Sequence, residues 1–120
     1  MADTGIFATT AEVQRKVGAN ASATSNVEAY INQFMTEAES YINVVSGYNW
    51  SDNYSALNVD VKGILKMAAS NIAAVMVLNY DPSVVSAREF ESRIDVMTFW
   101  FNKAMVQLKE PSVIKFMKDA

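Results

Sequence analysis

Apolar residues recur through most of the chain at the three- and four-residue spacing of an amphipathic α-helix. The clearest stretch covers 27–45 and follows a capping box, Ser25-x-x-Glu28. Its apolar positions form one stripe: Val27, Tyr30, Ile31, Phe34, Met35, Ala38, Tyr41, Ile42 and Val45. Polar residues fill the other side, and Gly47 is expected to end the helix. The pattern predicts a long helix with one packed face and one polar face.

A short helix and a long one are predicted before and after this stretch. The capping box Thr9-x-x-Glu12 begins a helix over 10–17. After a loop over 46–58 that is rich in Asn, Ser and aromatic residues, an almost uniformly apolar helix is expected over 59–79. Because the helix over 59–79 has few polar positions, we expect it at the centre of the fold.

The last long helix is predicted to extend from the capping box Ser86-x-x-Glu89 to about Lys109, shortly before a proline. We therefore expect an all-α fold, a small helical bundle of about four helices with a detached C-terminal segment. The helical domain would cover residues 1–110, and residues 111–120 would form a C-terminal docking tail.

The helix that ends near Lys109 carries more apolar surface than one core requires. Beside the face that is expected to pack inward, a second apolar strip contains Val96, Phe99, Trp100 and Met105. Large exposed apolar patches commonly mark protein contacts. We therefore expect Val96, Phe99 and Trp100 to lie between subunits.

The C-terminal segment contains four large apolar residues, Val113, Ile114, Phe116 and Met117. A helix this short is marginal in isolation, so the segment must dock on another surface. That surface is either its own domain or a partner protein, since short helices with spaced apolar anchors commonly insert into partners.

The composition excludes several kinds of catalytic and metal-binding site. The 120 residues include neither Cys nor His, which excludes disulfides, thiolate metal sites and the commonest general base. Glu37 and Glu39 are two positions apart on a helix and point in different directions, and no phosphate loop or nucleophile motif occurs. We predict no enzyme activity, no metal and no cofactor. An enzyme that uses only carboxylates would need Glu28, Glu37, Glu39 or Asp60 to converge in one pocket.

The aromatic residues of the loop over 46–58 allow two interpretations. Tyr48, Trp50 and Tyr54 lie beside amide side chains, a composition that is typical of sugar or protein contacts. Alternatively, these rings close the end of the bundle core and expose only their polar tips.

Charge is distributed unevenly along the chain. Residues 1–60 contain seven acidic and two basic residues. This excess of acidic residues argues against DNA binding through a basic surface. An acidic helix face is either simply solvated or a site of contact. The first residues lack the pattern of a secretory signal, and the most apolar run is shorter than the roughly 20 residues of a bilayer span. We therefore expect a cytoplasmic protein without a membrane anchor.

The order and character of these helices resemble the head–tail connector or adaptor proteins of tailed bacteriophages. The resemblance covers residues 9–120 and includes Tyr30-Ile31 and Glu37-Ala38-Glu39-x-Tyr41-Ile42. In that family the corresponding early helix alternates acidic and apolar residues, and the segment that matches 61–80 is buried.

The resemblance implies a structural virion protein that assembles in the host cytoplasm. It implies a homo-oligomeric ring, commonly dodecameric, that binds below the portal protein and extends the DNA channel, through which DNA passes without specific binding. A neck or tail-completion protein would bind on the other side. The implied roles are portal docking for Val113, Ile114, Phe116 and Met117, a lumen or inter-subunit position for Glu28, Glu37 and Glu39, and inter-subunit contact for Val96, Phe99 and Trp100. The alternative is a small monomeric helical binding module, of the inhibitor or immunity type, that acts on one protein partner.

Overall fold

The computed structural model describes residues 5–17, 27–80 and 87–119. These residues form five α-helices and one short 3-10 helix, and none of them forms a strand, so the fold is all-α. The elements are α1 (Thr10–Val17), α2 (Glu28–Ser46), η1 (Tyr54–Ala56), α3 (Val59–Tyr80), α4 (Ala87–Leu108) and α5 (Pro111–Asp119). The prediction of a small helical bundle is confirmed.

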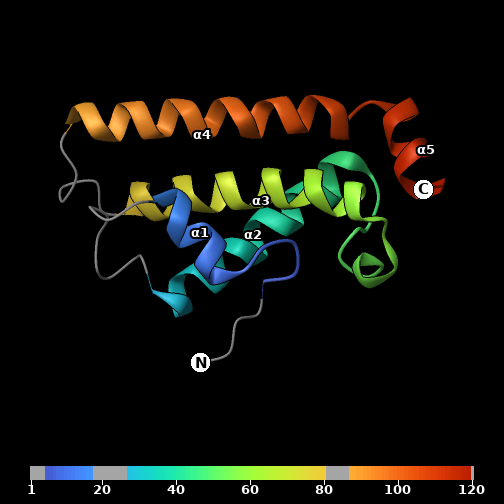
Figure 1. Ribbon diagram of the computed structural model, residues 1–120, viewed down its shortest axis with the longest axis horizontal. Helices are drawn as coiled ribbons and strands as arrows, with labels where there is room; N and C mark the ends of the chain where they lie inside the picture. The colour runs from blue at the N-terminus through green and yellow to red at the C-terminus, as the bar shows by residue number, and fades with distance from the viewer. Residues whose placement is uncertain (1–4, 18–26, 81–86, 120) are drawn as a thin grey trace.

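Helix α3 is the centre of the bundle. It packs against α4 along one side and against α1 and α2 on others, as Figure 1 shows, and these are the most extensive contacts between elements. Four of its alanines, Ala68, Ala69, Ala73 and Ala74, are fully buried. Small side chains at helix crossings let the neighbouring helices approach closely. The expected position of this segment is therefore confirmed.

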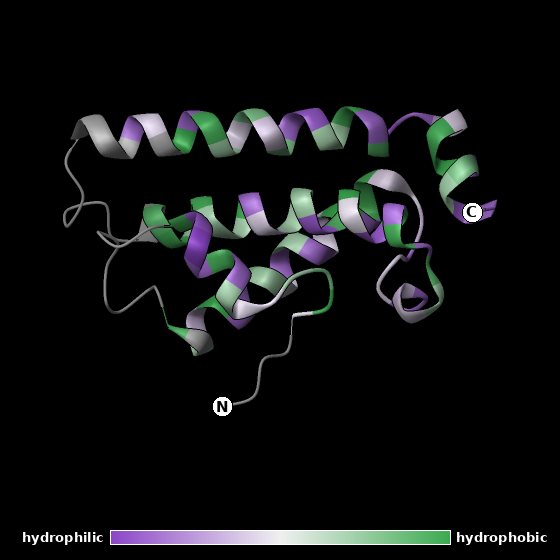
Figure 2. Cartoon of the chain, in the orientation of Figure 1, coloured by the Kyte–Doolittle hydropathy of each residue, from purple (hydrophilic) through white to green (hydrophobic). Residues whose placement is uncertain are grey.

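By length and composition alone, residues Val59–Leu78 could also cross a membrane, although most of this apolar stretch is buried inside the bundle. Figure 2 shows hydrophobic residues along α3 where α1, α2 and α4 surround it. The buried core helix of a soluble protein meets the same criteria, so length and composition alone are weak evidence for a membrane span.

Local hydrogen bonds define several of the helix ends. At the start of α1, the Glu12 carboxylate accepts a hydrogen bond from the Thr9 backbone N–H at 2.8 Å, and the Thr9 hydroxyl accepts one from the Glu12 N–H at 3.2 Å. At the start of α3, Asn58 Oδ1 accepts a bond from the Asp60 N–H at 2.9 Å. Both caps agree with the sequence signals.

The start of α2 differs from its prediction. Val27 is the N-cap, with φ −121° and ψ 157°, and no side chain caps it. The predicted cap, Ser25, lies outside the described residues, as does the capping residue Ser86 predicted for α4. At the other end of α2, Gly47 has φ 76° and its N–H donates to the Asn43 carbonyl, a left-handed C-terminal cap.

The loop between α2 and α3 closes one end of the core. Trp50 is completely buried, and its indole Nε1 donates a hydrogen bond to Ser46 Oγ at 3.0 Å. Asn43 fixes the loop from α2, because its Oδ1 accepts from the Trp50 N–H at 3.0 Å and its Nδ2 donates to Ser51 Oγ at 2.9 Å. The ring of Trp50 therefore fills the core and is withdrawn from sugar or protein contacts.

The C-terminal segment forms its own helix, α5, after a short turn at Lys109 and Glu110. Met117 is 3% exposed and belongs to the main core, while Val113 and Ile114 pack against that core with partial burial. Of the two docking surfaces that the sequence allowed, α5 therefore uses its own domain. The segment is separate along the chain and joined to the bundle in space.

Candidate interaction surfaces

The outer side of α4 carries an exposed apolar strip. Val96, Phe99 and Trp100 are 57%, 55% and 43% exposed. The rings of Phe99 and Trp100 lie 5.3 Å apart, and Lys103 Nζ lies 5.3 Å from the first ring centroid and 5.8 Å from the second. The positions that the sequence marked as surplus apolar surface are therefore on the surface of the described domain.

The predicted strip contained one error. Met105 is 3% exposed and belongs to the core, whereas Val106, one position further, is 65% exposed. The reason is helical geometry: Met105 lies one turn after the buried Phe101, and Val106 lies on the side of Phe99 and Lys103. Val106 extends the exposed strip toward the end of α4.

The polar side of α2 supplies fewer exposed acids than expected. Glu37 is exposed and has no hydrogen-bond or ion-pair partner among the described residues. The side chain of Glu28 lies outside the described residues. Glu39, in contrast, is only 6% exposed. The prediction that Glu39 faces a lumen or a neighbouring subunit is wrong.

Glu39 instead holds the N-terminal segment against α2. Its Oε2 accepts hydrogen bonds from the backbone N–H groups of Ile6 at 2.6 Å and Phe7 at 2.8 Å. The sequence contained a signal for this burial, because Glu39 lies four residues after Met35 and three before Ile42, both completely buried. A carboxylate at such a position needs donors, and the backbone of residues 6–7 provides them.

A mainly apolar groove of about 520 Å³ opens between α2, α3 and α4. The rings of Tyr41 and Phe101 lie 5.9 Å apart in its wall. Tyr41 is 48% exposed, so an aromatic surface is open to solvent at the rim. The lining residues are Glu37, Ala38, Tyr41, Ile72, Met76 and Phe101. Sequence reasoning did not find this groove, because it depends on how three helices pack.

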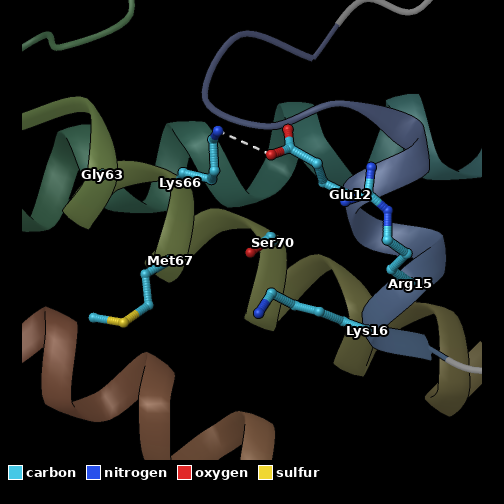
Figure 3. A pocket seen from close by; sticks show the side chains of 7 residues that line it. All are labelled: Glu12, Arg15, Lys16, Gly63, Lys66, Met67 and Ser70. Carbon is cyan, nitrogen blue, oxygen red and sulfur yellow. Dashed lines mark ion pairs between the residues drawn. The ribbon is translucent and has the colours of Figure 1, made fainter. Parts of the chain in front are cut away.

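On α1 and α3, basic side chains surround a pocket of about 320 Å³, shown in Figure 3. It is lined by Glu12, Arg15, Lys16, Gly63, Lys66, Met67 and Ser70. Lys66 Nζ and Glu12 Oε2 form an ion pair at 2.9 Å, which Figure 3 marks at the edge of the pocket. Arg15 and Lys16 add positive charge from the last turn of α1.

The ion pair changes the pKa of both partners. Partial burial pushes the pKa of Glu12 upward, but hydrogen bonds from Lys66 and Thr9 and the charge of Lys66 outweigh it, so the pKa of Glu12 is lowered. The hydrogen bond to Glu12, followed by the charge of Glu12, raises the pKa of Lys66. Both groups are therefore held in their charged forms.

The same pocket contains a buried hydroxyl, but its geometry gives no support to hydrolysis. A nucleophilic serine needs a base within hydrogen-bond distance. Ser70 Oγ is buried and has no hydrogen-bond partner among the described residues. The described residues also contain no group of three or more acidic side chains that could hold a metal ion.

The four residues predicted to dock on the portal differ in how far they are buried. Met117 lies in the core, and Val113 and Ile114 are partly covered by their own domain. Phe116 is 66% exposed. Only this last side chain is free to act as an apolar anchor while α5 stays packed.

No model of a known protein family, no curated protein and no solved structure matches this chain.

Proposed function

We propose that this protein is a structural virion subunit of the head–tail connector or adaptor class, which forms a ring below the portal of a tailed bacteriophage. The observation that carries the proposal is the exposed apolar strip of α4. Aromatic residues are enriched at protein interfaces, and Trp is prominent among the residues that dominate binding energy. In the proposed ring, this strip contacts a neighbouring subunit.

Two further features support a role in assembly. The proposal draws on the order of the helices, with a short first helix and a buried central helix, whereas the C-terminal segment packs on its own domain and is not detached as the resemblance implies. Glu37, the one α2 carboxylate that is exposed among the described side chains, would lie at the contact between neighbouring subunits of the ring. The proposed function needs no catalytic group, metal or cofactor.

In this proposal α5 docks on the portal as a packed helix. Phe116, with 66% exposure, is its apolar anchor, and Lys115 and Lys118 place positive charges on the same short helix. The neck or tail-completion protein binds the opposite end of the ring, and the finished assembly is located in the virion.

Co-expression with the portal protein of the same genome tests the proposal. Native mass spectrometry is expected to find a complex in which a closed ring of this chain is bound to the portal ring. Phe116→Ala is expected to weaken portal binding while the monomer remains folded, and Ser55→Ala, at an exposed position in η1, is the control. A protein that stays monomeric and does not bind the portal would refute the proposal.

One observation favours a second candidate, a small monomeric binding module of the inhibitor or immunity type. The C-terminal helix packs on its own domain through Met117, as a self-contained module would. The exposed strip of α4 would then bind one foreign protein. A stable 1:1 complex with a host protein, formed without portal or self-association, would favour this candidate over the ring.

A further inference from the structure

The domain carries two surfaces of opposite chemical character. We propose that these surfaces bind each other between copies of this chain, so that subunits join head to tail; the inference rests on the ring proposed above. The first, the basic face, consists of Arg15, Lys16, Val96, Trp100 and Lys103. The second, the acidic face, consists of Glu37, Tyr41, Val44 and Glu91, together with the groove beside Tyr41.

The two faces lie on opposite sides of α3. The basic pocket is lined by Met67 and Ser70, and the groove of the acidic face is lined by Ile72 and Met76. Successive helical residues are about 100° apart, so Ser70 and Ile72 point about 160° away from each other. One subunit can therefore contact a neighbour on each side.

The basic face is continuous from α1 to α4. Lys16 lines the basic pocket and also a second hollow of about 240 Å³, which it shares with Val96 of α4. Trp100 lies one turn after Val96, and Lys103 Nζ lies 5.8 Å from its ring. Positive charge and a projecting aromatic ring therefore occur on one surface.

The acidic face combines a hollow with negative charge. Glu37, Tyr41 and Val44 share one side of α2 by their four- and three-residue spacing, and the last two are 48% and 80% exposed. On α4, the exposed Glu91 lies ten residues before the groove residue Phe101. It points about 140° away from Val96 and about 80° away from Phe101, so it lies nearer the groove side of α4 than the side of Val96.

The two faces are complementary in shape and charge. The groove of about 520 Å³ is lined mainly by apolar and aromatic residues, a surface that fits the projecting Trp100 of a second copy. The basic residues around Trp100 would then lie near Glu37 at the groove rim. Two basic faces would repel each other, as would two acidic ones, so the contact is heterologous. A heterologous contact produces a ring when its rotation closes.

Two double variants test this arrangement by damaging one face each. Arg15→Glu with Trp100→Glu changes the basic face, and Glu37→Arg with Val44→Arg changes the acidic face. All four side chains are exposed, so both variants are expected to fold, which circular dichroism and thermal unfolding would check. Ser55→Glu and Ser55→Arg are the controls. They add a negative or a positive charge at an exposed position in η1, which belongs to neither face.

Each face variant alone is expected to weaken self-association about tenfold or more at low salt, because attraction becomes repulsion. Mixing the two variants is expected to give a 1:1 heterodimer, since each chain retains one intact face that can bind the intact face of the other. Native mass spectrometry and sedimentation velocity measure both effects. If the free wild type is monomeric, the number of copies bound to the portal is measured instead.

The outcomes separate the inference from the proposed function. A wild type that forms rings while both face variants form them equally well would overturn the head-to-tail contact and leave the ring function intact. Absence of a heterodimer in the mixture would also overturn it. A wild type that does not assemble, alone or on the portal, would refute the ring function itself.

Discussion

The buried carboxylate of Glu39 provides a sharp test of how the N-terminal segment is held. Its Oε2 accepts two backbone hydrogen bonds, from Ile6 at 2.6 Å and Phe7 at 2.8 Å. A hydrogen bond to a charged group contributes about 1.5–3 kcal/mol, and a donor left without a partner costs further free energy when it is buried. Ile6 is 43% exposed, so water can replace its partner, whereas Phe7 is 1% exposed.

Replacing Glu39 by Ala is therefore expected to lower the free energy of unfolding by about 2–4 kcal/mol. Glu39→Gln retains a neutral acceptor and is expected to cost about half as much. Urea denaturation followed by circular dichroism measures both values. Hydrogen exchange is expected to accelerate first at residues 5–8, where Tyr54 contacts Phe7 with ring centroids 5.4 Å apart.

The neighbouring exposed acid supplies the matched control. Glu37→Ala removes a carboxylate from the same helix and is expected to change the free energy of unfolding by less than about 0.5 kcal/mol. If Glu39→Ala were as stable as Glu37→Ala, the two short hydrogen bonds would contribute nothing, and the account of Glu39 as an anchor would be refuted.

Three further predictions concern pH, a turn and the C-terminal helix. Because the pKa of Glu12 is lowered in the folded state, its pair with Lys66 stabilises the protein above the ordinary carboxyl pKa, and this contribution is lost as pH falls through the lowered value. Acid titration of wild type against Glu12→Gln should show a difference of no more than about 1 kcal/mol, since Lys66 is half exposed; a larger difference would contradict the assignment. Gly47→Ala is expected to lower stability by about 1–2 kcal/mol in thermal unfolding because φ is 76°, and an unchanged melting temperature would exclude the left-handed cap. Met117→Ala is expected to cost about 2–5 kcal/mol in urea denaturation, while a neutral effect would mean that α5 is not docked.

Much of the fold could be predicted because its signals are local. The cap between Thr9 and Glu12, the cap at Asn58 and the turn at Gly47 each involve residues within four positions of one another. Helical periodicity likewise predicted the buried α3 and the exposed Trp100. Each of these signals lies within one helix or at one helix end, so it can be recognised before the neighbouring helices are known.

The errors occur where distant segments meet. The donors to Glu39 lie 32 and 33 residues away in a segment without periodicity, so its burial was missed although its helical neighbours are apolar. The groove beside Tyr41 exists only after α2, α3 and α4 have packed. Met105 was assigned to the surface because a long apolar helix offers several plausible stripes, and only packing selects one.

The burial of the loop tryptophan has a spectroscopic consequence. The chain contains two tryptophans, and Trp50 is completely enclosed while Trp100 is 43% exposed. A Trp100→Phe protein would therefore emit from an indole that changes environment only when the domain unfolds. A Trp50→Phe protein would emit from the surface of α4, where quenching by iodide reports whether a partner covers the ring. Each protein thus separates folding from association by its own fluorescence.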